Sequence, residues 1–180
     1  MNKIKKHLGF LGHLGELRFK MWMNSHAHEV LTASGLEEGL KVLDFGSGLG
    51  TYTIPAAKIV GERGRVYALD LSRRALDKVE ERAKRASLAN IERLDPAGEG
   101  GIPLGDGNLD HVLLIDVLQE IKDNSSLITE VSRVLRPGGN VTIFPMHLNK
   151  EAIESLMISK GFALKARIYE DRILLFNKGE

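Results

Sequence analysis

Short apolar runs alternate with segments of helical periodicity along the chain after Gly39. The runs are rich in Val, Ile and Leu, which is typical of strands that are covered on both faces. Strands are predicted at Lys41–Phe45, Arg65–Leu69, Ile91–Leu94, Asp110–Ile115, Asn140–Phe144, Ala163–Ile168 and Arg172–Phe176. Helices are predicted at Thr51–Val60, at Arg73–Ala86, from a cap at Ser125 or Ser126 to Leu135 (ended by Pro137-Gly138-Gly139), and at Glu151–Lys160. This alternation predicts an α/β fold with a doubly wound, mostly parallel sheet of seven strands.

Two segments depart from the alternation of strands and helices. Tyr169-Glu170-Asp171 separates the last two strands and predicts a hairpin, so we expect the last strand to be antiparallel. The stretch from Pro96 to Asn108 is rich in Gly and Pro, and we expect it to be loop.

The residues before the first strand follow another pattern. The triplets His7-Leu8-Gly9, Phe10-Leu11-Gly12 and His13-Leu14-Gly15 give a rough apolar stripe of leucines. A glycine inside a helix costs about 1 kcal/mol relative to alanine, so we expect this segment to be weakly helical or to order only when packed. Ser25–Ser34 predicts a firmer helix. We therefore divide the chain into an N-terminal helical arm or lid, residues 1–38, and one domain, residues 39–180.

Composition limits the classes of function. The chain has 180 residues, 43% of them hydrophobic and 27% charged, as expected of one globular domain. Its net charge of +1 gives no support for a nucleic-acid partner. It has no cysteine, which excludes disulfides, thiolate metal sites and cysteine nucleophiles and fits a cytoplasmic protein. No apolar run is long enough for a membrane span, and we expect no metal site, since His26 and His28 lack a third ligand at a persuasive spacing.

The run from Val42 to Gly50 carries the most chemical information. A short apolar strand bearing Asp44 leads into Gly46-Ser47-Gly48-Leu49-Gly50. Because glycine lacks Cβ, such a loop can turn sharply and let a ligand lie against the backbone. The spacing is not the Gly-x-Gly-x-x-Gly of dinucleotide binders, which would need glycine in place of Thr51. On spacing alone, both a cofactor loop and a tight structural turn stay open.

Four segments in order resemble the motifs of the class I S-adenosylmethionine-dependent methyltransferases, in particular the small-molecule type related to quinone-biosynthesis methyltransferases. They are Val42–Gly50, Val66–Ser72, Leu109–Leu118 and Val131–Gly139. The resemblance runs from about Gly39 to the end of the chain. It implies S-adenosyl-L-methionine as cofactor, S-adenosyl-L-homocysteine as product, and a terminal hairpin in the sheet.

The resemblance also implies a set of cofactor-binding residues. The backbone of Gly46, Ser47, Gly48 and Gly50 would lie against the methionine part of the cofactor, and Asp44 would face its ammonium group. Asp70, which is followed by Leu71, would accept hydrogen bonds from both ribose hydroxyls, and Asp95 would accept one from the adenine amino group beside Pro96 and Ala97. Asp116 would line the site on the side of the sulfonium and the acceptor. An acid at the end of a strand can instead cap a helix or stay solvated, and this alternative stays open for each of the four aspartates.

Methyl transfer from a sulfonium requires mainly that the nucleophile be held in line with the methyl group. A general base is needed only if the acceptor must lose a proton, and the candidates are His147, His26, His28 and Glu120. The alternative is that the histidines are surface or capping residues. We expect the acceptor to be selected by residues of Lys3–His28, Gln119–Asn124 and Pro145–Asn149. Leu8–Trp22 is a candidate lid over cofactor and acceptor, and the alternative is that this segment packs on the sheet or on a second subunit.

The sequence therefore predicts methyl transfer to a small, apolar or aromatic acceptor. The alternative is a non-catalytic S-adenosylmethionine-binding partner or regulator of another methyltransferase. An RNA or protein methyltransferase has no support from the net charge, and the glycine spacing and terminal hairpin argue against a nicotinamide-dependent oxidoreductase. The apolar N-terminal arm is compatible with a homodimer.

Overall fold

The computed structural model describes residues 2–96 and 101–179, with side chains from Leu14 onward. One sheet of seven strands has the order β3-β2-β1-β4-β5-β7-β6. The strands are β1 (Lys41–Phe45), β2 (Arg65–Leu69), β3 (Ile91–Leu94), β4 (Leu109–Ile115), β5 (Leu135–Phe144), β6 (Phe162–Ile168) and β7 (Ile173–Lys178). β7 is antiparallel to both of its neighbours, and the other pairs are parallel. The predicted doubly wound sheet with an antiparallel last strand is confirmed.

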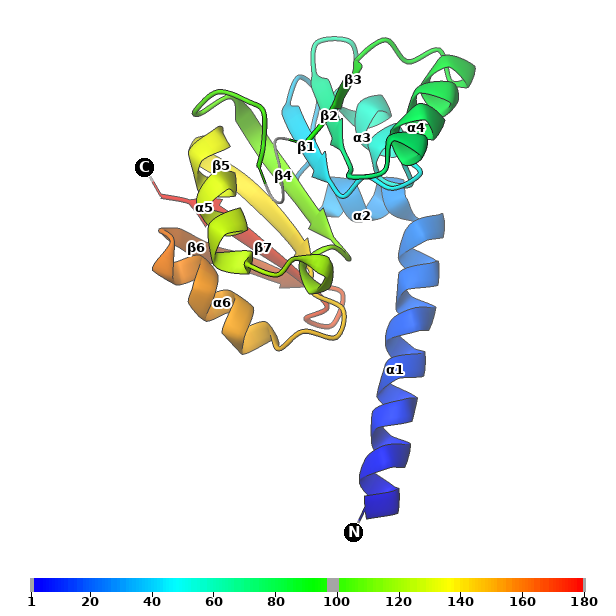
Figure 1. Cartoon of the computed structure of the whole chain (residues 1–180), viewed down its shortest axis with the longest axis vertical. Helices are drawn as coiled ribbons and strands as arrows, with labels where there is room; N and C mark the ends of the chain where they lie inside the picture. Colours follow the sequence, from blue (N-terminus) through cyan, green and yellow to red (C-terminus); the bar gives the residue numbers. More distant parts are fainter. Residues whose placement is uncertain (1, 97–100, 180) are drawn as a thin grey trace.

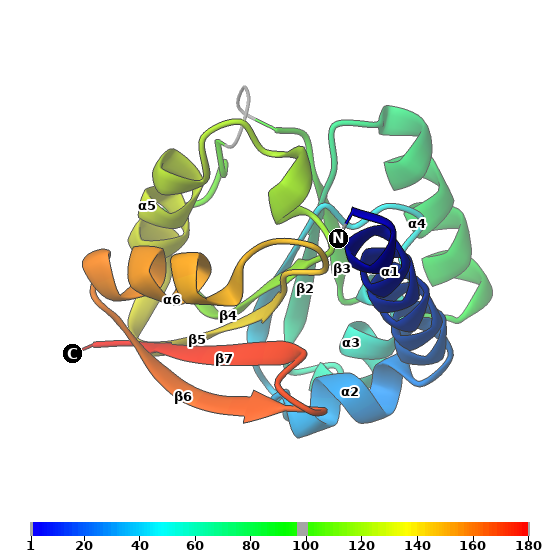
Figure 2. The same cartoon turned by 90° about the horizontal axis from the view of Figure 1, so that it is seen from below.

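Helices cover both faces of this sheet (Figures 1 and 2). They are α1 (Asn2–Ser25), α2 (Ala27–Ala33), α3 (Thr53–Val60), α4 (Arg73–Arg85), the short η1 (Leu118–Glu120), α5 (Asn124–Val134) and α6 (Lys150–Ser159). α2, α3 and α4 lie on one face, and α5 and α6 lie on the other (Figure 2).

The side chains of β1 show why the chain folds into layers. Val42 is buried with residues of α2 and α3, whereas its neighbour Leu43 is buried with residues of α5. Successive side chains of a strand point to opposite faces, so a run that is apolar throughout must be covered on both sides. The near-continuous apolar runs in the sequence therefore specify a sheet between two helical layers.

Three predicted boundaries were wrong for identifiable reasons. α3 begins at Thr53, not Thr51, because Gly50 has a φ of +80° and Tyr52 is the N-cap. α5 is capped by Asp123, whose side chain accepts a hydrogen bond from the Ser126 N–H at 3.1 Å, so neither Ser125 nor Ser126 is the cap. β5 begins at Leu135, not Asn140, because Leu135 pairs with Leu109 before the register shifts.

The N-terminal arm is more regular than the sequence predicted. α1 is a continuous helix of 24 residues despite its glycines. Its C-terminal half rests on the rest of the molecule, where Met23 is fully buried and the Tyr52 hydroxyl donates to the Asn24 side chain at 2.8 Å. The N-terminal half projects away from the sheet (Figure 1). The next predicted helix, Ser25–Ser34, is the shorter α2.

The remaining sequence expectations concern a loop and two absences. Residues 101–108 of the predicted loop contain no helix and end where β4 begins, whereas Ala97 lies outside the described residues. Within the described part of the chain, no helix has the length and apolar character needed to cross a membrane. The same residues contain no cluster of three or more His, Asp or Glu side chains able to hold a metal ion.

Candidate active site

The carboxyl ends of β1, β2 and β4 bring the predicted site residues to one edge of the sheet. β1 lies between β2 and β4, and its chain turns into the loop Gly46–Gly50. Asp70 follows β2, and Asp116 follows β4. The strand order reverses between β1 and β4, and crevices at such switch points are where open α/β sheets bind ligands.

A cleft of about 150 Å³ opens at this edge. It is lined by Phe45, Gly46, Leu69, Asp70, Leu71, Pro96, Val117, Glu120 and Ile121. Most of the walls are apolar, and the two charged side chains, Asp70 and Glu120, are both acidic. The cleft is smaller than the roughly 300–1,000 Å³ of sites that bury a drug-sized ligand, so it matches the nucleoside part of such a ligand better than the whole.

The glycines of the loop Gly46–Gly50 have two roles: they allow close packing, and they leave backbone that a ligand can approach. A Cβ on Gly46, where φ is +77°, would lie 2.7 Å from a methyl group of Val117, so this glycine is required by packing. A Cβ on Gly48 would meet nothing within 4 Å. The backbone at Gly48 therefore faces open space, where a ligand can approach. Arg82 on α4 fixes the loop from behind by donating to the Leu49 carbonyl oxygen at 2.6 Å.

Ser47 has the loop's one buried hydroxyl. Its Oγ has no hydrogen-bond partner among the described residues. A buried polar atom without a partner costs free energy, and such atoms are commonly satisfied by water or a ligand. This unpaired hydroxyl, together with the acidic cleft and the open backbone at Gly48, fits a polar ligand that carries positive charge.

Asp70 is held in place by the backbone. Its Oδ2 accepts from the Gly48 N–H and its Oδ1 from the Ser72 N–H, both at 2.8 Å. These bonds use about two of the four lone-pair sites of the carboxylate, so each oxygen can accept one more hydrogen bond. The carboxylate lines the cleft. Asp70 is thus a preorganised acceptor with capacity for two ligand donors.

Asp44 is buried beneath the loop rather than exposed in the cleft. Its side chain is only 3% exposed, and its Oδ2 accepts from the Thr53 hydroxyl at 2.6 Å. Burial raises the pKa of this carboxyl to about 6, against the lowering effect of the Thr53 hydrogen bond. Because Thr53 is the first residue of α3, Asp44 also holds the helix start, as the capping alternative suggested.

Asp116 forms an ion pair that the sequence did not reveal. Lys20 of α1 donates to its Oδ2, and the Gln119 side chain donates to its Oδ1 at 2.6 Å. Asp116 has a φ of +56°, which non-glycine residues rarely adopt, and strain of this kind often occurs at ligand sites. The ammonium group of Lys20, on α1, therefore compensates the negative charge of Asp116.

Asp95 and Pro96 follow β3. Pro96 and Leu71 both line the cleft, and Leu71 is 72% exposed, so both offer apolar surface to a ligand ring. The Asp95 carboxylate is exposed and accepts from Arg93 at 3.3 Å, and it is not part of the cleft wall.

The three candidate histidines do not converge. His147, in the loop after β5, pairs through Nδ1 with Glu16 of α1 at 2.5 Å. His26 stacks on Trp22 with 4.7 Å between ring centroids, and its Nδ1 lies 2.9 Å from the Trp22 carbonyl oxygen. His28 is exposed on α2. Only His147 lies at the carboxyl end of a strand neighbouring the cleft.

The segments expected to select the acceptor, Lys3–His28 and Gln119–Asn124, contain Glu16, Lys20 and Ile121, but the sequence did not single these residues out or indicate their partners. Val117, in the cleft wall, was not named as a site residue. Ion pairs between residues about a hundred positions apart leave no local pattern. Val117 and Ile121 had a usable signal, because they follow a strand-end acid in the segment that directly succeeds β4.

Comparison with known proteins agrees with this geometry. A family model described as a methyltransferase domain matches residues 36–172. Demethylmenaquinone methyltransferase from Geobacillus sp. (strain WCH70) is 33% identical over 113 residues, which are 63% of this chain and 48% of the relative. The same enzyme from Staphylococcus aureus (strain MRSA252) is 33% identical over 122 residues, 68% of this chain and 48% of the relative. The chain thus spans about half the length of these curated relatives.

Solved structures share the fold. A SAM-dependent methyltransferase from Aquifex aeolicus superposes with a TM-score of 0.73 at 24% identity, covering 84% of this chain and 87% of that one. Phosphoethanolamine N-methyltransferase 2 from Haemonchus contortus, crystallised with S-adenosyl-L-methionine, superposes with a TM-score of 0.66 at 24% identity over 77% of this chain and 36% of that one. The family model covers most of the chain. The chain therefore belongs to the family described by this methyltransferase-domain model.

Proposed function

We propose that this chain transfers the methyl group of S-adenosylmethionine to a small, apolar or aromatic acceptor. The observation that carries the proposal is the acid-lined cleft at the switch point of the sheet, bordered by the open glycine loop. The cofactor supplies a methyl group already activated on a sulfonium, so the protein's main task is to position the acceptor in line with it.

Asp70 and the loop are the proposed anchors for the cofactor. Asp70 would accept hydrogen bonds from the two ribose hydroxyls through the lone pairs that its backbone bonds leave free. The backbone at Gly46, Gly48 and Gly50 would lie against the methionine part, and the unpaired Ser47 hydroxyl is available to its polar groups.

The adenine ring would lie between Leu71 and Pro96. Both side chains line the cleft, and burial of the exposed Leu71 side chain would favour binding. Asp95, next to Pro96 in the chain, would accept from the adenine amino group once it turns from Arg93.

Asp44 and Asp116 are assigned to the charged end of the cofactor. Asp44 is too deeply buried for direct contact with solvent, so its charge would act on the ammonium group through the loop or a bridging water. Asp116 would line the sulfonium and acceptor side, where Lys20 also lies.

The acceptor class is argued from chemistry and from the relatives. The matched relatives are named demethylmenaquinone methyltransferases, which supports a quinol-like aromatic acceptor for this chain. If the acceptor must lose a proton, Glu120 is the candidate base that lines the cleft. None of the three histidines lines it, and all three are exposed. His147 is the best placed of them because it follows β5, whereas His26 and His28 do not follow a strand.

α1 is proposed to be a lid over this edge of the sheet. The Lys20–Asp116 ion pair and the contact between Glu16 and the His147 ring join the arm to the loops after β4 and β5. Breaking them would open the path by which cofactor and acceptor enter. The cytoplasmic location and the homodimer expected from the sequence stay predictions.

The test is transfer of an isotopically labelled methyl group to a panel of hydroquinones and naphthols, with calorimetric binding of S-adenosylmethionine and NAD measured alongside. We expect binding of S-adenosylmethionine but not NAD, and label in at least one aromatic acceptor. Binding without transfer to any acceptor would favour the non-catalytic alternative, and absence of S-adenosylmethionine binding would overturn the proposal.

A further inference from the structure

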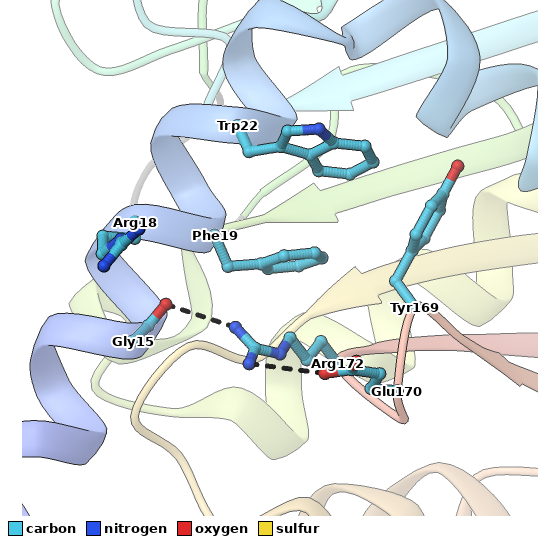
Figure 3. Close-up of a pocket in the computed structure, with 7 residues that line it drawn as sticks. All are labelled: Gly15, Arg18, Phe19, Trp22, Tyr169, Glu170 and Arg172. Atoms are coloured by element: carbon cyan, nitrogen blue, oxygen red, sulfur yellow. Dashed lines mark hydrogen bonds and ion pairs between the residues drawn. The ribbon is translucent and has the colours of Figure 1, made fainter.

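A second hollow lies between α1 and the turn that joins β6 to β7 (Figure 3). Its volume is about 490 Å³, and it is lined by residues of both elements. They are Gly15, Arg18, Phe19 and Trp22 on α1 and Tyr169, Glu170 and Arg172 at the turn. Because no residue of this hollow belongs to the cofactor cleft, it needs an explanation of its own.

Three aromatic rings form its walls. Phe19 and Trp22 stack with 5.6 Å between centroids and 21° between planes. Tyr169 faces them from the hairpin, 5.2 Å from Trp22 and 6.2 Å from Phe19 (Figure 3). Rings arranged in this way offer the faces and edges that a planar aromatic ligand packs against.

Arg172 supplies a cation beside these rings. Its guanidinium lies 4.7 Å from the centroid of Phe19 and donates one hydrogen bond, at 3.2 Å, to the Gly15 carbonyl oxygen. Its ion pair with Glu170 is long, at 3.6 Å, and the Glu170 side chain is 86% exposed. A guanidinium has five N–H donors in a planar fork, so most of its capacity to bind an anion is unused in the described structure.

Arg172 is the cation that lies beside the rings and can bind an anion. Arg18 also borders the hollow, but its side chain points away from the rings, and Glu170 is largely exposed (Figure 3). The turn is also held in an uncommon conformation, since Tyr169, Glu170 and Asp171 all have φ between +52° and +61°. Strain of this kind, when it persists, commonly marks a binding element.

The hollow also leads toward the proposed acceptor side. Gly15, Glu170 and Arg172 line a neighbouring hollow of about 440 Å³ that continues to Phe144 and Met146 at the end of β5. The Phe144 carbonyl oxygen accepts the backbone N–H of Asp116 at 3.2 Å. The two hollows are therefore adjacent, and the second one borders the end of β5 next to Asp116.

We propose that this hollow binds an aromatic carboxylate, with the ring against Phe19, Trp22 and Tyr169 and the carboxylate on Arg172. That such a molecule, or its ring, is the methyl acceptor rests on the function proposed above; the binding site itself does not. A planar guanidinium matches a carboxylate with two parallel hydrogen bonds, which a neutral amide of the same shape cannot accept.

Trp22 makes the proposal directly measurable, because it is the only tryptophan of the chain. The probes are 2-naphthoate and its neutral analogue 2-naphthamide, titrated without cofactor while Trp22 fluorescence is recorded and corrected for probe absorption. We expect saturable quenching by 2-naphthoate, with 2-naphthamide binding at least about tenfold more weakly.

Two variants separate charge from ring contacts. Arg172→Gln should lower the affinity for 2-naphthoate to about that for 2-naphthamide and leave the amide unaffected. Tyr169→Leu should weaken both probes. The matched control is Arg63→Gln, which removes the same charge from an exposed ion pair with Glu38 at the opposite edge of the sheet.

The results of these titrations test the aromatic site and the proposed methyl transfer separately. No saturable quenching by either probe, or equal binding of both probes that Arg172→Gln does not change, would overturn the proposed site. S-adenosylhomocysteine binding is measured on the same proteins by calorimetry. Naphthoate binding in a protein that does not bind S-adenosylhomocysteine would leave the aromatic site standing and contradict the proposed function.

Discussion

At the scale of single residues, Asp44 near the end of β1 and Asp70 after β2 lie in different environments and have different roles. Asp70 lies at the cleft, and two backbone N–H groups fix the orientation of its carboxylate. Asp44 is buried, and desolvation raises its pKa to about 6. A buried carboxylate that is ionised at neutral pH weakens the fold, so Asp44 is a residue whose presence is better explained by ligand binding than by stability.

Asp44→Asn tests this interpretation through the pH dependence of stability. The folded-state pKa of about 6 lies above the ordinary carboxyl value of 3.8, so ionisation of Asp44 destabilises the folded state fully above pH 6 and not at all well below pH 4. The variant should gain about 2 kcal/mol relative to the natural chain between pH 4 and pH 7. Urea unfolding of both proteins at the two pH values measures this change.

If the two proteins differ in free energy of unfolding by the same amount at both pH values, the raised pKa assigned to Asp44 is contradicted. If the substitution also weakens the hydrogen bond from Thr53, the difference in unfolding free energy shifts by the same amount at both pH values. Only the change of that difference with pH is therefore informative. His111 is buried beside Thr142, and burial lowers its pKa to about 3. Its protonation destabilises both proteins alike as the pH falls below about 6.5, and it cancels in the comparison.

At the scale of elements, the arm and the sheet meet through contacts between distant parts of the sequence. Lys20 binds Asp116, Glu16 binds His147, and Arg172 binds the backbone of Gly15. These contacts hold the part of α1 that contains Gly15 against the rest of the molecule, where packing can compensate a weak intrinsic propensity. They do not reach Gly9 and Gly12, which lie in the half that projects away. The same contacts are the basis for proposing that α1 is a lid.

Lys20→Met tests whether this ion pair holds the arm. Methionine keeps much of the apolar stem and removes the ammonium, so α1 should open more often. A half-buried ion pair is worth about 1 kcal/mol, so chymotrypsin should cleave within residues 14–25 about fivefold faster. Lys84→Met, on the exposed face of α4, is the control and should leave the rate unchanged.

The same digestion tests the lid. S-adenosylhomocysteine should slow cleavage within α1 in the natural chain, because a closed arm protects its own backbone. Equal rates with and without the ligand would contradict the lid, and equal rates for Lys20→Met and the control would contradict the role of the ion pair.

At the scale of the whole molecule, the sequence predicted what is encoded locally. Apolar runs and glycine stops predicted all seven strands and the antiparallel last one. The spacing of Gly46–Gly50 predicted a sharp turn, and the resemblance to methyltransferase motifs indicated that this loop and Asp70 belong to one site; Gly46 and Asp70 both line the cleft. The start of β5 was misplaced because Pro137-Gly138-Gly139, normally a helix end followed by a turn, is carried within the strand beside a register shift.

The parts that could not be predicted depend on tertiary contacts. Lys20 and Asp116 are 96 positions apart, and Arg172 and Gly15 are 157 apart. Neither pair has a spacing that marks it in the sequence. The aromatic hollow likewise joins the first helix to the last hairpin, and its charge and shape exist only once the sheet has brought the two together.

The most direct test of the central claim is a crystal structure of this chain with S-adenosylhomocysteine. The account predicts the ribose hydroxyls on the Asp70 carboxylate, the adenine ring between Leu71 and Pro96, and the amino-acid end against Gly46–Gly50. Ligand bound elsewhere, or bound in the cleft with Asp70 still engaged only by Gly48 and Ser72, would contradict it.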